Sequence, residues 1–164
     1  MSGTIVSPYL RDLTQADRAG IEAITRSVKV FRDDEIAVAL EVFDEAVGGS
    51  PANTYSALGA ESEGRLVGWI CWGPTPCTLG TYDLYWMAVD PGLHGTGIGT
   101  ALLLEMERRL AGPARLIVIE TAGRPDYAAT RAFYQARGYS PVALVPDFYA
   151  PGDDQVVFVK AVGR

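Results

Sequence analysis

The amino-acid sequence predicts an α/β (α+β) protein with a single mixed, mostly antiparallel sheet of about seven strands flanked by about four helices. Two observations lead to this class. Strand-like and helix-like segments follow one another in the order β, α, α, β, β, β, α, β, α, β, β. A single sheet covered by helices buries the apolar faces of all these segments. The composition is globular, since 48% of the 164 residues are hydrophobic and 21% are charged. We expect parallel strand pairing around the two later helices, because each connects two strands.

The N-terminal part predicts one strand and two helices. Residues 5–11 have the pattern of a short strand. Thr14 and Asp17 have the spacing of a capping box, with Asp in place of the usual Glu or Gln, so we expect a helix over 15–28. A second helix is expected over 34–47, and the Gly-Gly-Ser-Pro segment that follows should end it. Its apolar residues at helical spacing are Ile36, Leu40, Phe43 and Val47.

The rest of the chain predicts further strands and two more helices. The strand-like runs are 54–60, 65–72, 82–89, 116–120, 139–147 and 155–161. The almost wholly apolar run 116–120 is typical of a central strand covered on both faces. Helices are expected over 98–110 and 126–137, with Gly138 at the C-terminal cap of the second.

Charge and composition exclude several classes of protein. The net charge is -6 and no Lys/Arg cluster is present, so we expect no nucleic-acid partner. No apolar run approaches the roughly 20 residues of a spanning helix, and the N-terminus shows no secretory signal, so we expect a cytoplasmic protein without a membrane partner. Cys71, Cys77 and His94 are too few for a structural zinc site, and we expect no metal.

The sharpest feature is the segment from Val89 to Thr100, where an apolar strand ends, three alternate residues are glycine and a helix begins. Glycine lets the backbone approach a ligand closely, and the first turn of a helix offers unpaired N–H groups at the positive end of the dipole. Together these features predict a phosphate seat that needs no lysine. A plain glycine-rich turn is the alternative. Neither the P-loop pattern nor the dinucleotide pattern fits, which disfavours a nucleotide-triphosphate enzyme.

Two segments carry a family resemblance. His94-x-x-Gly97-x-Gly99, after a strand ending in Val-Asp-Pro, resembles the [Gln/Arg]-x-x-Gly-x-[Gly/Ala] signature of the GNAT N-acetyltransferase superfamily, with His94 where Gln or Arg is usual. Residues 127–139 are similar to the family's Asn-x-x-Ala-x-x-x-Tyr-x-x-x-Gly-Phe segment. They depart from it at Tyr127, Thr130 and Tyr139. The hairpin 147–154 resembles that of the ribosomal-protein N-terminal acetyltransferase branch.

The resemblance implies that residues 1–164 form a single acyl-CoA N-acyltransferase domain with the GNAT fold. Such a domain transfers the acetyl group of acetyl-CoA, its cosubstrate, to a primary amine of a small molecule or protein N-terminus by direct attack in a ternary complex. The implied cofactor-binding residues are Met87, Ala88, Val89, His94, Gly95, Thr96, Gly97, Ile98, Gly99 and Thr100. The alternative is a non-catalytic sensor domain that binds acetyl-CoA or CoA.

Two side chains are the catalytic candidates. Tyr134 lies at the position of the family's Tyr, and a phenol with a pKa of about 10 keeps a proton to give to a thiolate. Glu120 ends an apolar strand, where a carboxylate must be solvated, paired or functional, and burial would raise its pKa and suit it to act as a base. Asp83 is the rival base. The alternatives are a core aromatic for Tyr134 and an ion pair with Arg124 or Arg131 for Glu120.

The acceptor pocket is expected between the first two helices, the 82–89 strand and the last hairpin. Its candidate lining residues are Phe31, Arg32, Asp83, Tyr85, Asp147 and Tyr149. The partner is an amine, and the acidic balance of the chain mildly favours a cation. An exposed strand or the last hairpin could also support a homodimer.

Overall fold

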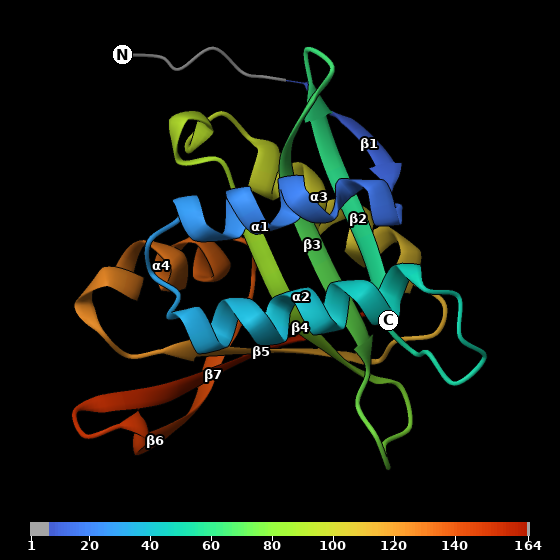
Figure 1. The fold of residues 1–164 in the computed structure, drawn as a ribbon. Helices are drawn as coiled ribbons and strands as arrows, with labels where there is room; N and C mark the ends of the chain where they lie inside the picture. The colour runs from blue at the N-terminus through green and yellow to red at the C-terminus, as the bar shows by residue number, and fades with distance from the viewer. Residues whose placement is uncertain (1–6, 164) are drawn as a thin grey trace. The chain divides into compact units, whose positions relative to one another are not determined.

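The computed structural model describes residues 7–163 (Figure 1). In this range a mixed sheet has the strand order β1-β2-β3-β4-β5-β7-β6 and is accompanied by four α-helices, which confirms the predicted fold class. The strands are β1 Tyr9–Asp12, β2 Ser56–Ser62, β3 Arg65–Pro74, β4 Thr81–Val89, β5 Leu116–Ala122, β6 Ser140–Ala150 and β7 Asp153–Ala161. The helices are α1 Arg18–Ser27, α2 Asp33–Val47, α3 Ile98–Leu110 and α4 Ala128–Ala136. The 3-10 turns are η1 Gln15–Asp17, η2 Pro91–Leu93 and η3 Pro125–Tyr127.

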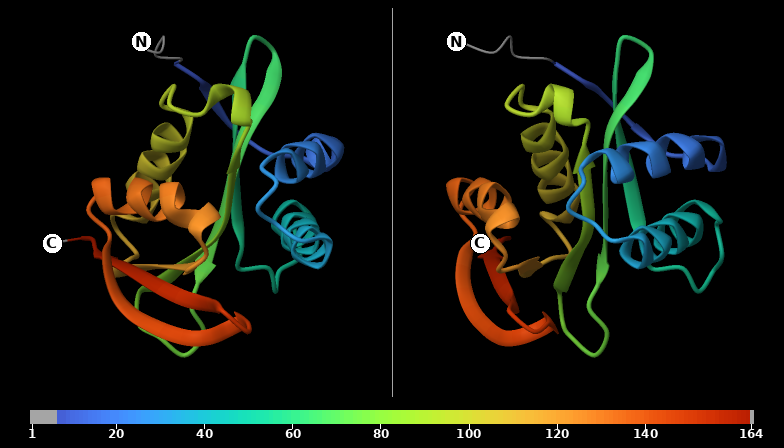
Figure 2. Two further views of the ribbon diagram at one scale, coloured as in Figure 1. Left: turned by 90° about the vertical axis from the view of Figure 1, so that its left-hand side faces the viewer. Right: turned by 60° about the vertical axis from the view of Figure 1, so that its left-hand side comes forward.

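The described chain forms two compact units. Unit 1 comprises residues 7–73 and 86–109, and unit 2 comprises residues 74–85 and 110–163. In unit 1, β1, β2 and β3 are antiparallel neighbours. Helices α1 and α2 lie side by side on one face of these strands, and α3 lies on the other (Figure 2).

The core of unit 1 fills the space between α1, α2 and the sheet. Its buried residues are Leu13, Ile21, Ile24, Ile36, Ala39, Leu40, Phe43, Trp69, Cys71 and Ala88. The fully buried Trp69 donates from its indole Nε1 to Thr25 Oγ1 at 3.1 Å, so its one polar atom is satisfied. On the other face, a Cβ at Gly68 would come within 3.2 Å of a Leu102 methyl. Glycine at this position therefore lets α3 pack closely on β3.

Unit 2 contains the parallel strand pair. The first part of β4 pairs with β5 from Thr81↔Leu116 to Leu84↔Ile119, and no further pair follows, although β4 runs on to Val89. Strand β5 pairs antiparallel with β7, and β7 with β6. Figure 2 shows the β6–β7 hairpin as a long, curved ribbon. Strand β6 forms one edge of the sheet and is exposed along nearly its whole length. A homodimer through this edge stays a prediction.

One expectation about strand pairing is wrong. The β4–α3–β5 connection gives the parallel pair that the sequence predicts, but the β5–α4–β6 connection does not. Strand β7 lies between β5 and β6 and pairs antiparallel with both. The tight turn after Ala150 folds β7 back beside β6, and β7 occupies the edge of β5 that β6 would have used. Order along the chain could not reveal this insertion.

Most segment predictions are confirmed, with small changes at their ends. The Thr14 N–H donates to the Asp17 carboxylate at 2.9 Å, as a capping box requires, and Gly138 has a φ of +87° at the end of α4. The helices expected from residues 15 and 126 each begin with a 3-10 turn. Of the strand expected over 5–11, residues 5 and 6 lie outside the described range, and β1 begins at Tyr9. Across residues 7–163, none of the helices is long and apolar enough to cross a bilayer.

Candidate functional site

The glycine loop of unit 1 is held by Asp90 at its start. The Asp90 N–H donates to the Val67 carbonyl of β3 at 2.8 Å. Its carboxylate accepts from the Gly92 N–H at 2.9 Å and pairs with Arg65 at 2.8 Å. Both bonds lower the pKa of Asp90, and the bond from Arg65 has the larger effect. The loop thus enters η2 from a fixed point on the sheet.

The loop amides divide into two groups. His94 and Thr96 donate their N–H groups to the Pro91 and Leu93 carbonyls, both at 3.3 Å, so these two amides serve the loop's own turns. At the start of α3, the Ala101 N–H donates to the Gly97 carbonyl. Four preceding amides donate to no group among residues 7–163: Gly95, Gly97, Ile98 and Gly99. The donor set for a phosphate is therefore narrower than the predicted run from 94 to 100.

The glycines leave open space beside these amides. Gly95 has a φ of +77° and Gly97 a φ of +97°, and a Cβ built at either would meet no atom within 4 Å. A side chain at Gly97 would be strained by the backbone and would project into this space. Unpaired amides, an open approach and the N-terminus of a 13-residue helix fit a diphosphate.

The strand that leads into the loop carries three of the implied cofactor-binding residues. Ala88 and Val89 are buried and Met87 is half-buried in β4. The backbone of these residues can bind a cofactor only where β5 does not pair with it. The β4–β5 ladder ends at Leu84↔Ile119, before these residues are reached.

Glu120 and Asp83, both in unit 2, face the same side of the sheet. Asp83 pairs with Val118 across the parallel ladder, and Glu120 follows Val118 by two residues on β5. The pKa of Glu120 is raised, first by the partial burial of its carboxyl group and then by the negative charge of Asp83. A hydrogen bond with Gln155 acts in the opposite direction. A carboxyl group with a raised pKa is a stronger proton acceptor than an ordinary glutamate.

No cation neutralises this carboxylate pair among residues 7–163, where neither Glu120 nor Asp83 forms a salt bridge. The ion pair weighed for Glu120 is not adopted. Arg131 donates from Nη1 to the carbonyls of Ala122 and Arg124, and Arg124 pairs with other carboxylates, those of Asp126 and Asp153.

Two further residues at this place were not predicted from the sequence. Gln155 of β7 is only 5% exposed and bonds to Glu120, and Thr75 donates from Oγ1 to Asp83 Oδ2 at 2.6 Å. Tyr85 OH also donates to this oxygen, at 3.4 Å, so one of the predicted acceptor-pocket residues does join the carboxylates. Neither residue carries a motif. Thr75 is 8 residues from Asp83 and follows the end of β3, whereas Gln155 reaches Glu120 because β7 pairs with β5.

Tyr134 lies on the opposite face of the same unit. Its ring packs against Tyr139 at 5.9 Å and Phe158 at 6.4 Å between centroids. Phe158 is the cross-strand partner of Ile119, whereas Glu120 is opposite Val157, so the two catalytic candidates lie on different faces of the β5–β7 pair. Burial raises the pKa of Tyr134, which is only 4% exposed. The phenol therefore stays protonated at neutral pH.

The other predicted pocket residues have local roles. Phe31 packs edge-on against Trp86 at 5.1 Å, and Tyr149 against Phe148 at 4.9 Å. Arg32 pairs with the first turn of α2. Asp147, at a φ of +54°, accepts from the Gly152 N–H at 2.7 Å and so shapes the hairpin turn.

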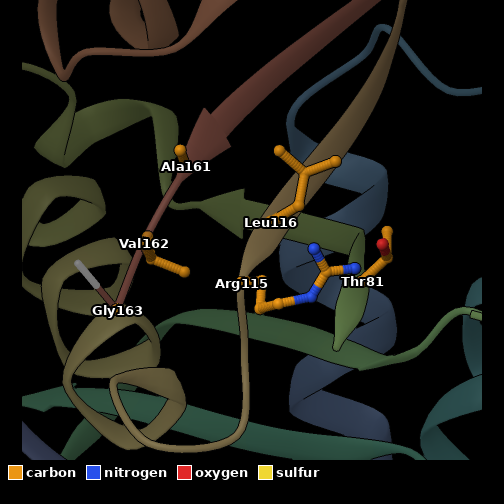
Figure 3. A pocket seen from close by; sticks show the side chains of 6 residues that line it. All are labelled: Thr81, Arg115, Leu116, Ala161, Val162 and Gly163. Atoms are coloured by element: carbon orange, nitrogen blue, oxygen red, sulfur yellow. The ribbon is translucent and has the colours of Figure 1, made fainter. Parts of the chain in front are cut away.

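A pocket of about 360 Å³ lies elsewhere in unit 2 (Figure 3). It is lined by Thr81, Arg115, Leu116, Ala161, Val162 and Gly163. Thr81↔Leu116 is the first pair of the parallel ladder, at the end away from Glu120. Arg115 is bound there through Nε to the Leu79 carbonyl at 2.6 Å. Within the described residues, no group of three His, Cys, Asp or Glu side chains could hold a metal ion.

Two curated proteins are similar in sequence to this chain. One is an uncharacterized N-acetyltransferase of Methanocaldococcus jannaschii, 33% identical over 62% of this chain and 63% of its own length. The other is an L-2,4-diaminobutyric acid acetyltransferase of Nocardia farcinica, 32% identical over 57% of this chain and 54% of its own length. The matched parts thus span less than two thirds of either relative.

Solved structures share the fold over nearly the whole chain. A GNAT-family protein of Desulfovibrio desulfuricans has a TM-score of 0.88 and 37% identity, over 94% of this chain and 99% of its own. The ribosomal-protein-S18-alanine N-acetyltransferase of Escherichia coli has a TM-score of 0.77 and 17% identity, with 96% of each chain covered. A PaiA N-acetyltransferase of Thermoplasma acidophilum, solved with coenzyme A, has a TM-score of 0.73 and 17% identity, over 95% of this chain and 99% of its own. At these last two identities the likeness shows the fold alone.

The family assignment rests on the match to a family model. Residues 18–139 match the model of the acetyltransferase (GNAT) family, and this segment includes both the glycine loop and the helix that carries Tyr134. The same fold recurs in the structures above. The chain therefore belongs to the acetyltransferase (GNAT) family.

Proposed function

We propose that this protein is an N-acetyltransferase that moves the acetyl group of acetyl-CoA to a primary amine in a ternary complex. The observation that carries the proposal is the loop from Val89 to Gly99, whose unpaired amides precede α3 and fit a diphosphate. The coenzyme A complex of a relative in fold supports the choice of cofactor. The proposal treats residues 1–164 as one domain, since the family match includes parts of both units.

Acetyl-CoA supplies the activated acetyl group, and the chain supplies donors and proton transfer. The amides of Gly95, Gly97, Ile98 and Gly99 bind the diphosphate. The backbone of Met87, Ala88 and Val89 binds the pantetheine arm, and we assign one N–H of this stretch to the thioester oxygen, where charge develops. His94, Thr96 and Thr100 complete the loop.

Proton transfer uses the two faces of unit 2. Glu120, with its raised pKa, accepts the proton that the acceptor nitrogen loses as its bond to the acetyl carbon forms. The negative charge of Asp83 helps to raise the pKa of that base. As the carbon–sulfur bond breaks, Tyr134 gives a proton to the leaving sulfur from the opposite face. The nitrogen lone pair makes the new bond, and the thiol leaves neutral.

The carboxylate pair also points to the class of acceptor. Asp83 and Glu120 form no salt bridge with a Lys or Arg side chain in residues 7–163, so an ammonium group would relieve their repulsion. A relative named for L-2,4-diaminobutyric acid supports an acceptor with two amino groups. We therefore place a small diamino compound ahead of a protein N-terminus. Phe31, Tyr85 and Tyr149 remain the proposed lining of its pocket.

Binding and turnover test the proposal separately. Calorimetric titration with acetyl-CoA should give saturable binding, and thiol release should depend on the amine added. The amine panel should include a diamino acid, a monoamine of equal length and a peptide N-terminus, with the diamino acid giving the highest kcat/KM. Tight CoA binding without thiol release on any amine would support the sensor alternative. No binding of CoA would reject both.

A further inference from the structure

His94 occupies a position that resembles a Gln or Arg position of the family, and its side chain has a definite contact. Its Nε2 lies 2.9 Å from the carbonyl oxygen of Val89. A carbonyl oxygen only accepts, so Nε2 carries the hydrogen of this bond. The imidazole therefore connects the start of the glycine-rich segment to the end of β4, across Asp90 and η2.

This contact completes the fixation of one peptide unit. The carbonyl of Val89 and the N–H of Asp90 belong to the same planar group. His94 holds its oxygen, and the Val67 carbonyl accepts its N–H at 2.8 Å. Bound at both ends, the plane cannot rotate without breaking a hydrogen bond. The direction in which the chain leaves β4, and hence the position of the amides after His94, depends on the imidazole.

The second ring nitrogen gives His94 a property that Gln lacks. With Nε2–H bound to Val89, the neutral ring has a lone pair on Nδ1. Protonation would place an N–H there and add a positive charge to the loop. Asp90 is near enough for the charge of His94 to help lower its pKa, and Arg65 pairs with Asp90. The charges of Asp90 and Arg65 cancel one another, so the positive charge of a protonated His94 would act on an anion bound in the loop.

We propose that His94 is a positioning residue that shapes the diphosphate loop through Val89, and that its protonation strengthens the binding of CoA. The inference rests on the proposed function, since it assigns the loop to CoA. Histidine is the side chain whose charge changes most readily around physiological pH, so the test spans pH 5.5 to 8. The affinity for CoA should rise as the pH falls through this range.

The test is calorimetric titration with CoA from pH 5.5 to 8 on three proteins: wild type, His94→Gln and His94→Ala. The Gln side chain can donate an N–H to Val89 but does not titrate, whereas Ala does neither. At pH 8, His94→Ala should bind CoA about fivefold more weakly than wild type, and His94→Gln should recover most of that loss. The ratio of wild-type to His94→Gln affinity should rise about three- to fivefold from pH 8 to 5.5. Titration of CoA itself affects both proteins equally and cancels in this ratio.

Each result tests one part of the proposal. A ratio that stays flat with pH would overturn the role of protonation. Equal affinity of His94→Ala and wild type at pH 8 would overturn the positioning role, and failure of His94→Gln to recover binding would do the same. A wild-type protein that does not bind CoA would instead overturn the proposed function. Thermal unfolding of the variants verifies that each is folded before titration.

Discussion

Glu120 and Asp83 lie on the same face of the β4–β5 pair, and the negative charge of Asp83 helps to raise the pKa of Glu120. Their side chains come from strands joined by all of α3, yet the parallel register makes them diagonal neighbours. A base in this setting is protonated to a higher pH than an ordinary glutamate. In the proposed mechanism, the pair therefore gives the activity a pH dependence that one substitution can shift.

The first prediction concerns Asp83→Asn. Glu120 works as a base only when ionised, so kcat/KM should rise with pH through its raised pKa. Removing the charge of Asp83 lowers that pKa, so the acidic limb of the profile should move to lower pH. The profile should be measured with the same amine for each protein, so that the ionisation of the amine contributes equally to every profile. Asp126→Asn, an exposed carboxylate paired with Arg124, is the matched control and should leave the limb in place.

The second prediction concerns Glu120→Gln. The amide cannot accept the proton, so kcat should fall by about two to four orders of magnitude, the usual contribution of a general base. The affinity for CoA should stay within about twofold, since the loop amides are unchanged. Steady-state thiol release and calorimetry measure the two quantities. If kcat were retained, water or Asp83 would have to be the proton acceptor.

The third prediction concerns Tyr134→Phe. The ring keeps its packing on Tyr139 and Phe158, but the proton donor is lost, so kcat should drop by about 100-fold with little change in CoA affinity. Tyr139→Phe removes a hydroxyl from the same aromatic cluster and is the control. It should keep the rate of wild type even if it unfolds at a lower temperature. Equal rates for Tyr134→Phe and wild type would exclude Tyr134 from the mechanism.

The fourth prediction concerns Gly97. Gly97→Glu places a carboxylate in the open space beside the unpaired amides, so CoA binding should weaken by at least about 100-fold. Gly97→Ala separates charge from backbone strain: its φ of +97° should cost about 1–2 kcal/mol of stability. Gly112→Ala, at an open position without positive φ, should change neither property. Unaltered CoA binding by Gly97→Glu would show that the diphosphate lies elsewhere.

The sequence alone was sufficient for the regular elements and for the loop. The bounds of α3 agree with the predicted 98–110, because the helix starts after a run of glycines and ends before Gly112 and Pro113. The candidates Glu120 and Tyr134 were also visible, one as a charge in an apolar strand and the other within a recognisable segment. These signals are local, and a local pattern can be recognised in a single sequence.

Only the tertiary structure decided which of these groups meet. The insertion of β7 between β5 and β6 brings Gln155 to Glu120, and the parallel register brings Asp83 to the same face. The imidazole of His94 likewise reaches the Val89 carbonyl only because η2 folds the chain back. Strand pairing and loop closure depend on the free energy of the whole fold rather than on neighbouring residues. The sequence therefore determined which chemistry the chain contains, and the fold determined which side chains share a face and which amides stay unpaired.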